Sequence, residues 1–267
     1  MHADITGQSR TETDTLTQSV VTRARALLDR QPDDARPVYG LHLMLGLPGA
    51  LQSELGRDGH PKAGGILPDL GLERRMWGGS KIAFHAPLET GPVDIRETIG
   101  GVDEREGGSG RMAIVRLERE FRCGGTLCVS ESSNIIYLGP RKDSVSAAPV
   151  DLPGSVLTEE TFTPDTRMLF RFSALTYNAH RIHYDRDYAR DAEGYPDLVV
   201  HGPLIAFRLM NGAHDALGRE PTSFSIRLLR PAFVDRPIRL VWTQTQDGVE
   251  GLALDSEGHA HARATAS

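Results

Sequence analysis

A short polar run in the second half of the chain has the composition of an acid–base site. Its polar members are Asn178, His180, His183 and Tyr184, and the dipeptide His201-Gly202 follows further along. An imidazole near its ordinary pKa of ~6.5 exchanges protons at neutral pH. The N–H of Gly202 can bind an oxygen that gains negative charge at the start of a helix, whereas Pro203 has no N–H. These residues indicate proton transfer next to an anion-binding backbone amide.

A buried helix is predicted immediately after His201. Pro203 suits the first turn of a helix, and Gly218 suits the residue that ends it. Apolar side chains between them cover most of the helix circumference, which predicts burial on nearly every side. The predicted helix would therefore place Gly202 at the edge of the protein core.

Alternating apolar residues predict strands through much of the remaining chain. A first antiparallel series is predicted at 80–88, 93–102, 111–121 and 126–138, and a second at 223–233, 237–246, 249–257 and 259–266. Two modest helices are predicted at 16–28 and 38–47, and His183 is placed near a strand end.

The two strand series indicate an internal duplication. Pro87 and Pro92 follow a strand in the first series as Pro231 and Pro237 do in the second. Residues 141–154 have the composition of a linker, so we place the boundary near 150, with units at 1–150 and 151–267. The predicted class is α+β, with two tandem hotdog units, each an antiparallel sheet wrapped round a central helix.

The polar run resembles the R-specific enoyl-CoA hydratase signature of the MaoC-like hotdog superfamily. In that signature an Asp precedes a His by five residues, and His-Gly opens the central helix; Asn178, His183 and His201-Gly202 occupy these places. Together with Arg74-Arg75-Met76-Trp77-Gly78-Gly79, the polar run resembles a subfamily that comprises the mesaconyl-C4-CoA and itaconyl-CoA hydratases and the type 2 hydroxyacyl-thioester dehydratases. The departure is Asn178, because an amide cannot replace the usual Asp as an acid–base group.

The resemblance implies addition of water to a conjugated thioester. This reaction needs a base for the water, a proton donor for Cα and dipoles for the enolate oxygen. We expect His183 to move the proton, Asn178 to orient the water, and Gly202 to bind the oxygen. His180 and Tyr184 remain alternative acids, while His180 could instead be structural, and His201 either lines the pocket or caps the helix.

The first unit has no counterpart of the histidine run, so we expect it to shape the acyl pocket without a catalytic motif. Arg74 or Arg75 could pair with a distal carboxylate or with the phosphates of CoA, with Trp77 beside the substrate and Lys62 as a weaker candidate. The alternative is a solvated basic turn with Trp77 in the core.

Composition narrows the class of protein. Among 267 residues, 36 are acidic and 30 basic without a polybasic block, which argues against nucleic-acid and membrane binding. Two cysteines, Cys123 and Cys128, are too few for a disulfide framework and are expected to be inert thiols. A polar start and the lack of a long apolar run predict a cytoplasmic protein. We expect no cofactor, because CoA is part of the substrate. The sequence leaves open whether the protein forms a homo-oligomer.

The predicted function is a hydratase that acts on a C5-dicarboxylyl-CoA to give citramalyl-CoA. Three alternative functions remain. One is a 3-hydroxyacyl-ACP or 3-hydroxyacyl-CoA dehydratase of fatty-acid or polyketide metabolism. Another is a hotdog thioesterase, which would need a carboxylate base absent at 178 and 183, and the last is a non-catalytic acyl-binding subunit. A zinc site built on His180, His183 and His201 is not expected, because the Glu of an H-E-x-x-H helix is missing.

Overall fold

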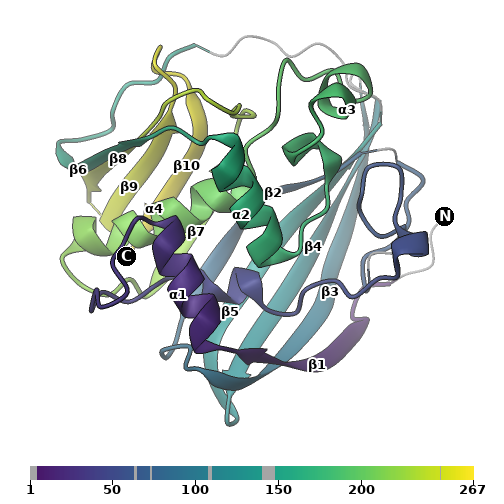
Figure 1. Cartoon of the computed structure of the whole chain (residues 1–267), viewed down its shortest axis with the longest axis horizontal. Coiled ribbons are helices and arrows are strands. Elements are labelled where there is room, and N and C mark those ends of the chain that lie inside the picture. Colours follow the sequence, from purple (N-terminus) through teal and green to yellow (C-terminus); the bar gives the residue numbers. More distant parts are fainter. Residues whose placement is uncertain (1–4, 63–64, 73, 108–109, 140–147, 247) are drawn as a thin grey trace.

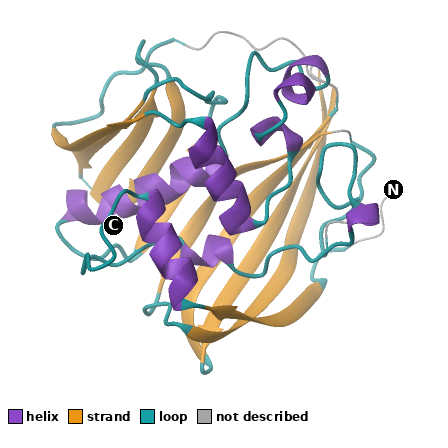
Figure 2. Cartoon of the chain, viewed as in Figure 1, coloured by secondary structure: helices purple, strands orange, loops and turns teal. Residues whose placement is uncertain are grey.

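Ten antiparallel strands form one strongly curved sheet in the part of the chain that the structure describes (Figure 1, Figure 2). The computed structural model describes residues 5–62, 65–72, 74–107, 110–139, 148–246 and 248–267. The strands are β1 Ser9–Leu16, β2 Arg74–Phe84, β3 Gly91–Gly107, β4 Gly110–Cys123, β5 Thr126–Leu138, β6 Val156–Phe162, β7 Ser223–Leu228, β8 Ile238–Thr245, β9 Gly248–Leu254 and β10 Ala260–Ala266. The α-helices are α1 Gln18–Leu27, α2 Thr166–Thr176, α3 Arg186–Asp191 and α4 Gly202–Leu217, and the 3-10 turns are η1 Leu41–Met44, η2 Gln52–Glu54 and η3 Arg181–His183.

The strand order has two mirrored halves. The order β1-β3-β4-β5-β2 continues as β7-β10-β9-β8-β6, so each strand of the first half has a counterpart in the second. The halves meet where β2 pairs with β7. At this junction Gly79 has φ +131°, and a Cβ there would lie 2.1 Å from the carbonyl oxygen of Ile226, so the close pairing requires glycine. The mirrored order agrees with two copies of one unit; the boundary near 150 stays a prediction.

Helix α4 is the buried helix that the sequence predicts. It begins at Gly202 and ends where Gly218 adopts the left-handed conformation, with Pro203 in its first turn. Its fully buried apolar side chains include Leu204, Phe207 and Leu209, each of which stabilises the fold by roughly 1.5–3 kcal/mol relative to exposure. In Figure 1, α4 lies against the C-terminal strands, while α1 and α2 lie beside each other across the sheet.

The helix predicted at 16–28 forms as the ten-residue α1, whereas the helix predicted at 38–47 is wrong. Only the 3-10 turn η1 forms there, because Gly40 and Gly46 adopt left-handed conformations on either side of it. Leu41, Met44 and Leu45 nevertheless join the same hydrophobic core as α1, α2 and α4. One continuous core therefore connects the two halves.

Several elements differ from the sequence prediction. Strand β2 begins at Arg74, not 80, so Arg74, Arg75 and Trp77 lie in a strand and not in the basic turn considered above. His183 lies in η3, not at a strand end. Helices α2 and α3 and strand β1 were not predicted; β1 alternates between exposed and half-buried polar residues, which gives no apolar pattern. Half of the predicted linker, residues 141–147 of 141–154, lies outside the described residues.

No helix of the described chain is long and apolar enough to span a membrane.

Candidate active site

Four histidine rings form a contiguous row in front of the first turn of α4. The ring centroids are 4.2 Å apart for His60 and His180, 5.4 Å for His180 and His183, and 3.6 Å for His183 and His201. The last two rings are stacked, with their planes inclined by 20°. Three members come from the predicted polar run and its helix, whereas His60 belongs to the first half of the chain. The structure thus collects four proton-exchanging side chains at one place.

Hydrogen bonding fixes the tautomer of His183. Its Nδ1 lies 2.7 Å from the carbonyl oxygen of Val199, and a carbonyl can only accept a hydrogen bond. The proton of the neutral ring is therefore on Nδ1, which leaves the lone pair of Nε2 available to accept a proton. Turn η3 holds this arrangement, because Val199 N–H also donates to the carbonyl of Ile182. His183 thus has the tautomer that a general base needs.

Burial keeps His180, His183 and His201 neutral. Desolvation lowers the pKa of His183 to about 4, against a weaker upward effect of its bond to Val199. Desolvation also lowers the pKa of His180 and of His201, and the neighbouring histidines act in the same direction. These three rings are therefore unprotonated at neutral pH, and a proton placed on any of them is held weakly.

His201 and Gly202 lie at the N-terminal end of α4. His201 is fully buried, and its Nε2 lies 2.8 Å from the Ser173 hydroxyl. No described residue accepts a hydrogen bond from Gly202 N–H, which begins the helix. A Cβ at Gly202 would lie 2.3 Å from Leu228 and 3.3 Å from Trp77. The glycine therefore lets strands β2 and β7 pack tightly against the start of α4.

Asn178 closes the turn that follows α2. Its Oδ1 accepts the N–H of His180 at 2.9 Å, in the manner of an Asx turn, and its own N–H donates to Ser173. The hydrogen bond from His180 N–H uses one lone pair of Oδ1 and leaves the other lone pair for water. Asn178 thereby orients the backbone that carries His180; its role in holding water stays a prediction.

Asp58 and His60 were missed by sequence analysis. They lie between η2 and β2, and Asp58 Oδ2 is 2.9 Å from His60 Nδ1. The sequence contains the signal Asp58-Gly59-His60, but nothing local indicates that it lies against residues 120 positions away.

The first-half side chains that the sequence predicts as substrate contacts have different surroundings in the structure. Burial lowers the pKa of His180 most, and the positive charge of Arg75 adds to this lowering. Trp77 packs next to Gly202 and donates from Nε1 to Ser133. Arg74 instead donates to the carbonyl of Gly139. Trp77 therefore lies beside the start of α4, and Arg75 is the arginine of this set whose charge acts on His180.

Tyr184 and Lys62 are both exposed. Tyr184 follows η3, with 53% of its surface accessible, and Lys62 lies on the surface after η2. Their roles in binding stay predictions.

Comparison with known proteins identifies the family. Residues 40–234 match the sequence profile of the Htd2 family, described as hydroxyacyl-thioester dehydratase type 2. The chain belongs to this family. Mesaconyl-C(4)-CoA hydratase of Chloroflexus aurantiacus is 42% identical to it over 227 residues, which cover 84% of this chain and 81% of that protein. The family expected from the sequence is confirmed.

Solved structures confirm the fold of this Htd2 family member. A MaoC-like dehydratase from Phytophthora capsici superposes with a TM-score of 0.73 at 13% identity, covering 98% of this chain and 96% of the other. A Mycobacterium tuberculosis protein described as having a double hotdog fold superposes with a TM-score of 0.56 at 12% identity, covering 98% and 94%. The α+β double-hotdog prediction is confirmed.

The Htd2 chain offers one close group of metal-ligating side chains among its described residues. Atoms of Asp58, His60 and His180 lie within 4.8 Å of one another. Asp58 and His60 are hydrogen-bonded to each other, and His60 and His180 contact through their rings. These contacts fit a hydrogen-bonded pair against a ring better than three lone pairs aimed at one ion.

Both cysteines are free thiols, and burial raises the pKa of Cys128.

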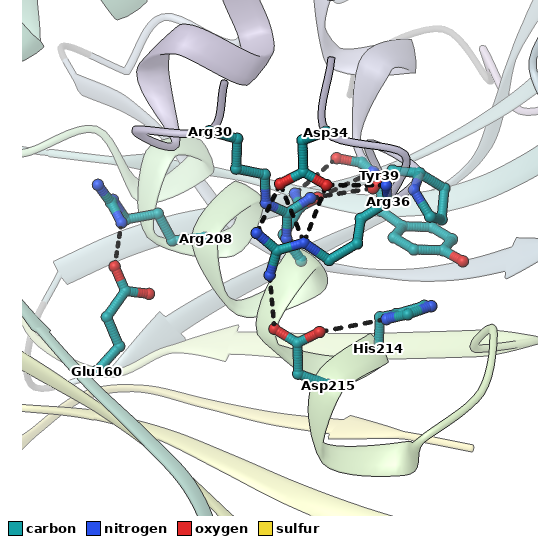
Figure 3. Close-up of polar contacts among 10 residues, drawn as sticks. Arg30, Asp34, Arg36, Tyr39, Glu160, Arg208, His214 and Asp215 are labelled. Carbon is teal, nitrogen blue, oxygen red and sulfur yellow. Dashed lines mark hydrogen bonds and ion pairs between the residues drawn. The ribbon is translucent and has the colours of Figure 1, made fainter. Parts of the chain in front are cut away.

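A second polar cluster lies at the other end of α4 in this Htd2 protein. Figure 3 shows Arg36 between Asp34 and Asp215, and Arg208 beside Glu160. Asn211 bonds to the backbone of Tyr39 through both its oxygen and its nitrogen. The cluster lines a polar hollow beside Trp242, and its charges are largely paired with one another. It fastens residues 30–39 to α4.

Proposed function

We propose that this Htd2 family member adds water reversibly across the double bond of an α,β-unsaturated acyl-CoA, with His183 as the base. The observation that carries the proposal is the buried, neutral His183, whose Nδ1–H is held by Val199 and whose Nε2 is open to accept a proton.

The enolate that forms during this reaction needs a hydrogen-bond donor. Gly202 N–H, unpaired among the described residues, supports this role, since it lies at the positive end of a sixteen-residue helix. Asn178 orients the attacking water, and His201 lines the pocket behind His183. Water would add its oxygen to Cβ and give its proton to His183, which would then return a proton to Cα.

The proposed substrate is a C5-dicarboxylyl-CoA such as mesaconyl-C4-CoA or itaconyl-CoA, and the product is citramalyl-CoA. The name of the Chloroflexus aurantiacus relative supports this class. Arg75 on β2 supports the same class, because its positive charge acts on His180 and a guanidinium can pair with a distal carboxylate. We further propose a cytoplasmic enzyme that uses no cofactor.

A 3-hydroxyacyl-thioester dehydratase is the second candidate function, favoured by the description of the family itself. It would run the same chemistry in the direction of water loss on a neutral acyl chain. The two candidates differ in what lies beyond the double bond, so a comparison of acyl groups separates them.

The experiment follows the loss of enoyl-thioester absorbance with mesaconyl-C4-CoA, itaconyl-CoA and crotonyl-CoA. We expect kcat/KM to be at least tenfold lower for crotonyl-CoA, and Arg75→Gln to remove most of that preference. Arg96→Gln, an exposed arginine on β3, is the matched control and should keep it. Equal efficiency on all three acyl groups would favour the dehydratase, and no turnover of any would contradict both candidates.

A further inference from the structure

Backbone carbonyls of the loop that carries Asp58 and His60 accept hydrogen bonds from Arg181, two residues before His183. Arg181 N–H donates to the carbonyl of Asp58 at 2.8 Å, and the guanidinium of Arg181 donates to the carbonyl of Arg57 at 3.1 Å. Gly59 has φ +91°, and a Cβ there would lie 1.9 Å from the carbonyl oxygen of Ala179. Only glycine permits this approach. The loop is therefore held at a fixed position against the residues that precede His183.

Within this loop the carboxylate of Asp58 holds the ring of His60. Asp58 Oδ1 accepts the N–H of His60 at 3.0 Å, and Oδ2 lies 2.9 Å from His60 Nδ1. Since a carboxylate only accepts, His60 carries a proton on Nδ1, and no described residue is hydrogen-bonded to its Nε2. Its ring then lies 4.2 Å from that of His180. The pair thus continues the histidine row and adds one negative charge at its end.

Hydration has a step that requires such a charge. When water adds, its O–H bond breaks, its oxygen bonds to Cβ, and the proton enters the histidine row. The π electrons of the double bond move to the thioester oxygen, so an enolate and an imidazolium exist together. A proton then leaves the row for Cα, and the row ends as it began. An imidazolium in this buried row is costly without a nearby anion.

Resting on the proposed function, we propose that Asp58 and His60 are positioning residues of this acid–base site. Asp58, acting through His60 and His180, supplies the negative charge that stabilises the protonated row, which the amide of Asn178 cannot supply. The first half of the chain then contributes to the chemistry, contrary to the expectation that it only shapes the pocket.

The charges around His180 agree with this role. Burial, His60, His183 and Arg75 all disfavour a proton on His180 and lower its pKa, whereas Asp58 acts in the opposite direction. Burial also opposes ionisation of Asp58, but its bonds to His60 outweigh this and lower the pKa of Asp58. Among the described groups that affect the pKa of His180, Asp58 is therefore the carboxylate.

The test compares Asp58→Asn and His60→Gln with the wild-type chain on the best acyl-CoA of the panel. We expect kcat to fall at least tenfold in each variant, while KM changes less than threefold. In Asp58→Asn the acid limb of the pH–rate profile should also move to lower pH, because a row without its anion binds a proton less readily. Asp58→Glu should restore part of kcat.

The control is His259→Gln. His259 forms a similar pair with Asp255, with Nδ1 3.1 Å from Oδ2, on the turn between β9 and β10. This variant should keep both kcat and the position of the acid limb. Thermal melting of every variant separates loss of fold from loss of rate.

Other outcomes overturn the inference. A folded Asp58→Asn variant with unchanged kcat and acid limb would remove Asp58 from the chemistry. Wild-type activity that is lost on chelation with EDTA and restored by Zn²⁺ would make the group a metal site instead. Failure of the proposed function looks different, because the wild-type chain would then hydrate none of the acyl-CoAs. Turnover by the wild type with unaffected variants would overturn this inference alone.

Discussion

The imidazole of His183 stacks on that of His201 with 3.6 Å between ring centroids, and the two rings have different partners. His183 bonds through Nδ1 to a backbone carbonyl, whereas His201 bonds through Nε2 to the hydroxyl of Ser173. Stacking of this kind restricts rotation of His183 and excludes water from one of its faces. A base held in this way can meet a substrate without reorganising.

His183→Gln should lower kcat by roughly 10²–10⁴, the usual range for losing a general base. The amide can keep a donor near Val199 but cannot accept a proton for catalysis. His214→Gln, at the far end of α4, is the control and should retain its rate. Initial rates and circular dichroism measure the two effects; a folded His183→Gln enzyme with near-normal kcat would remove His183 from the site.

The pH dependence of kcat/KM should show an acid limb far below that of an ordinary histidine. Burial lowers the pKa of His183 to about 4, so the ring remains neutral and active as pH falls from 8 to about 5. Activity should be lost only as pH falls further and the ring takes up a proton. A limb centred near pH 6.5 would show that His183 titrates as an exposed imidazole.

The free energy of unfolding should fall on acidification, because His183 is buried as a neutral ring. In the unfolded chain His183 binds a proton near pH 6.5, whereas in the folded chain it does so only near 4. The unfolded state therefore binds more protons between these values, and stability is complete above pH 6.5 and is lost as pH falls towards 4. The contribution of His183 is on the order of 3 kcal/mol. Urea unfolding at pH 7.5 and 4.5 measures it, and His183→Gln should show a smaller pH effect than wild type.

Gly202→Ala tests the amide at the start of α4. Its Cβ would lie 2.3 Å from Leu228, so the helix start must shift relative to β7. We expect kcat to fall at least tenfold as the N–H leaves its position, since removing one oxyanion donor costs about 10²–10³. Gly49→Ala is the control, because its Cβ meets no atom within 4 Å. An unchanged kcat in Gly202→Ala would argue against the oxyanion role.

The parts of the site that the sequence predicts are those with local signals. Helix α4 has its Pro203 and Gly218 boundaries, and His183 lies in a run of polar residues, so both were found. His60 could not be placed, because its position depends on the contact of Gly59 with Ala179, far along the chain. The predicted helix at 38–47 failed for a related reason, since tertiary packing of Leu41 and Met44 stabilises a turn between two left-handed glycines.

Asn211 should be the most sensitive polar residue for stability in the cluster at the C-terminal end of α4. It is fully buried; its Oδ1 accepts the N–H of Tyr39 and its Nδ2 donates to the carbonyls of Tyr39 and Phe207. Asn211→Ala leaves the buried groups of Tyr39 without partners, so we expect a loss of about 2–3 kcal/mol in the free energy of unfolding.

Asp215→Ala provides the contrast for this prediction. Asp215 is exposed and lies 3.5 Å from Arg36 (Figure 3), and an exposed ion pair is worth about 0–1 kcal/mol. Urea unfolding at pH 7.5 gives both values. Because the cluster lies at the opposite end of α4 from His183, folded Asn211→Ala protein should keep its kcat. Equal stability losses in the two variants would mean that the exposed ion pairs, and not the buried amide, hold residues 30–39 against the helix.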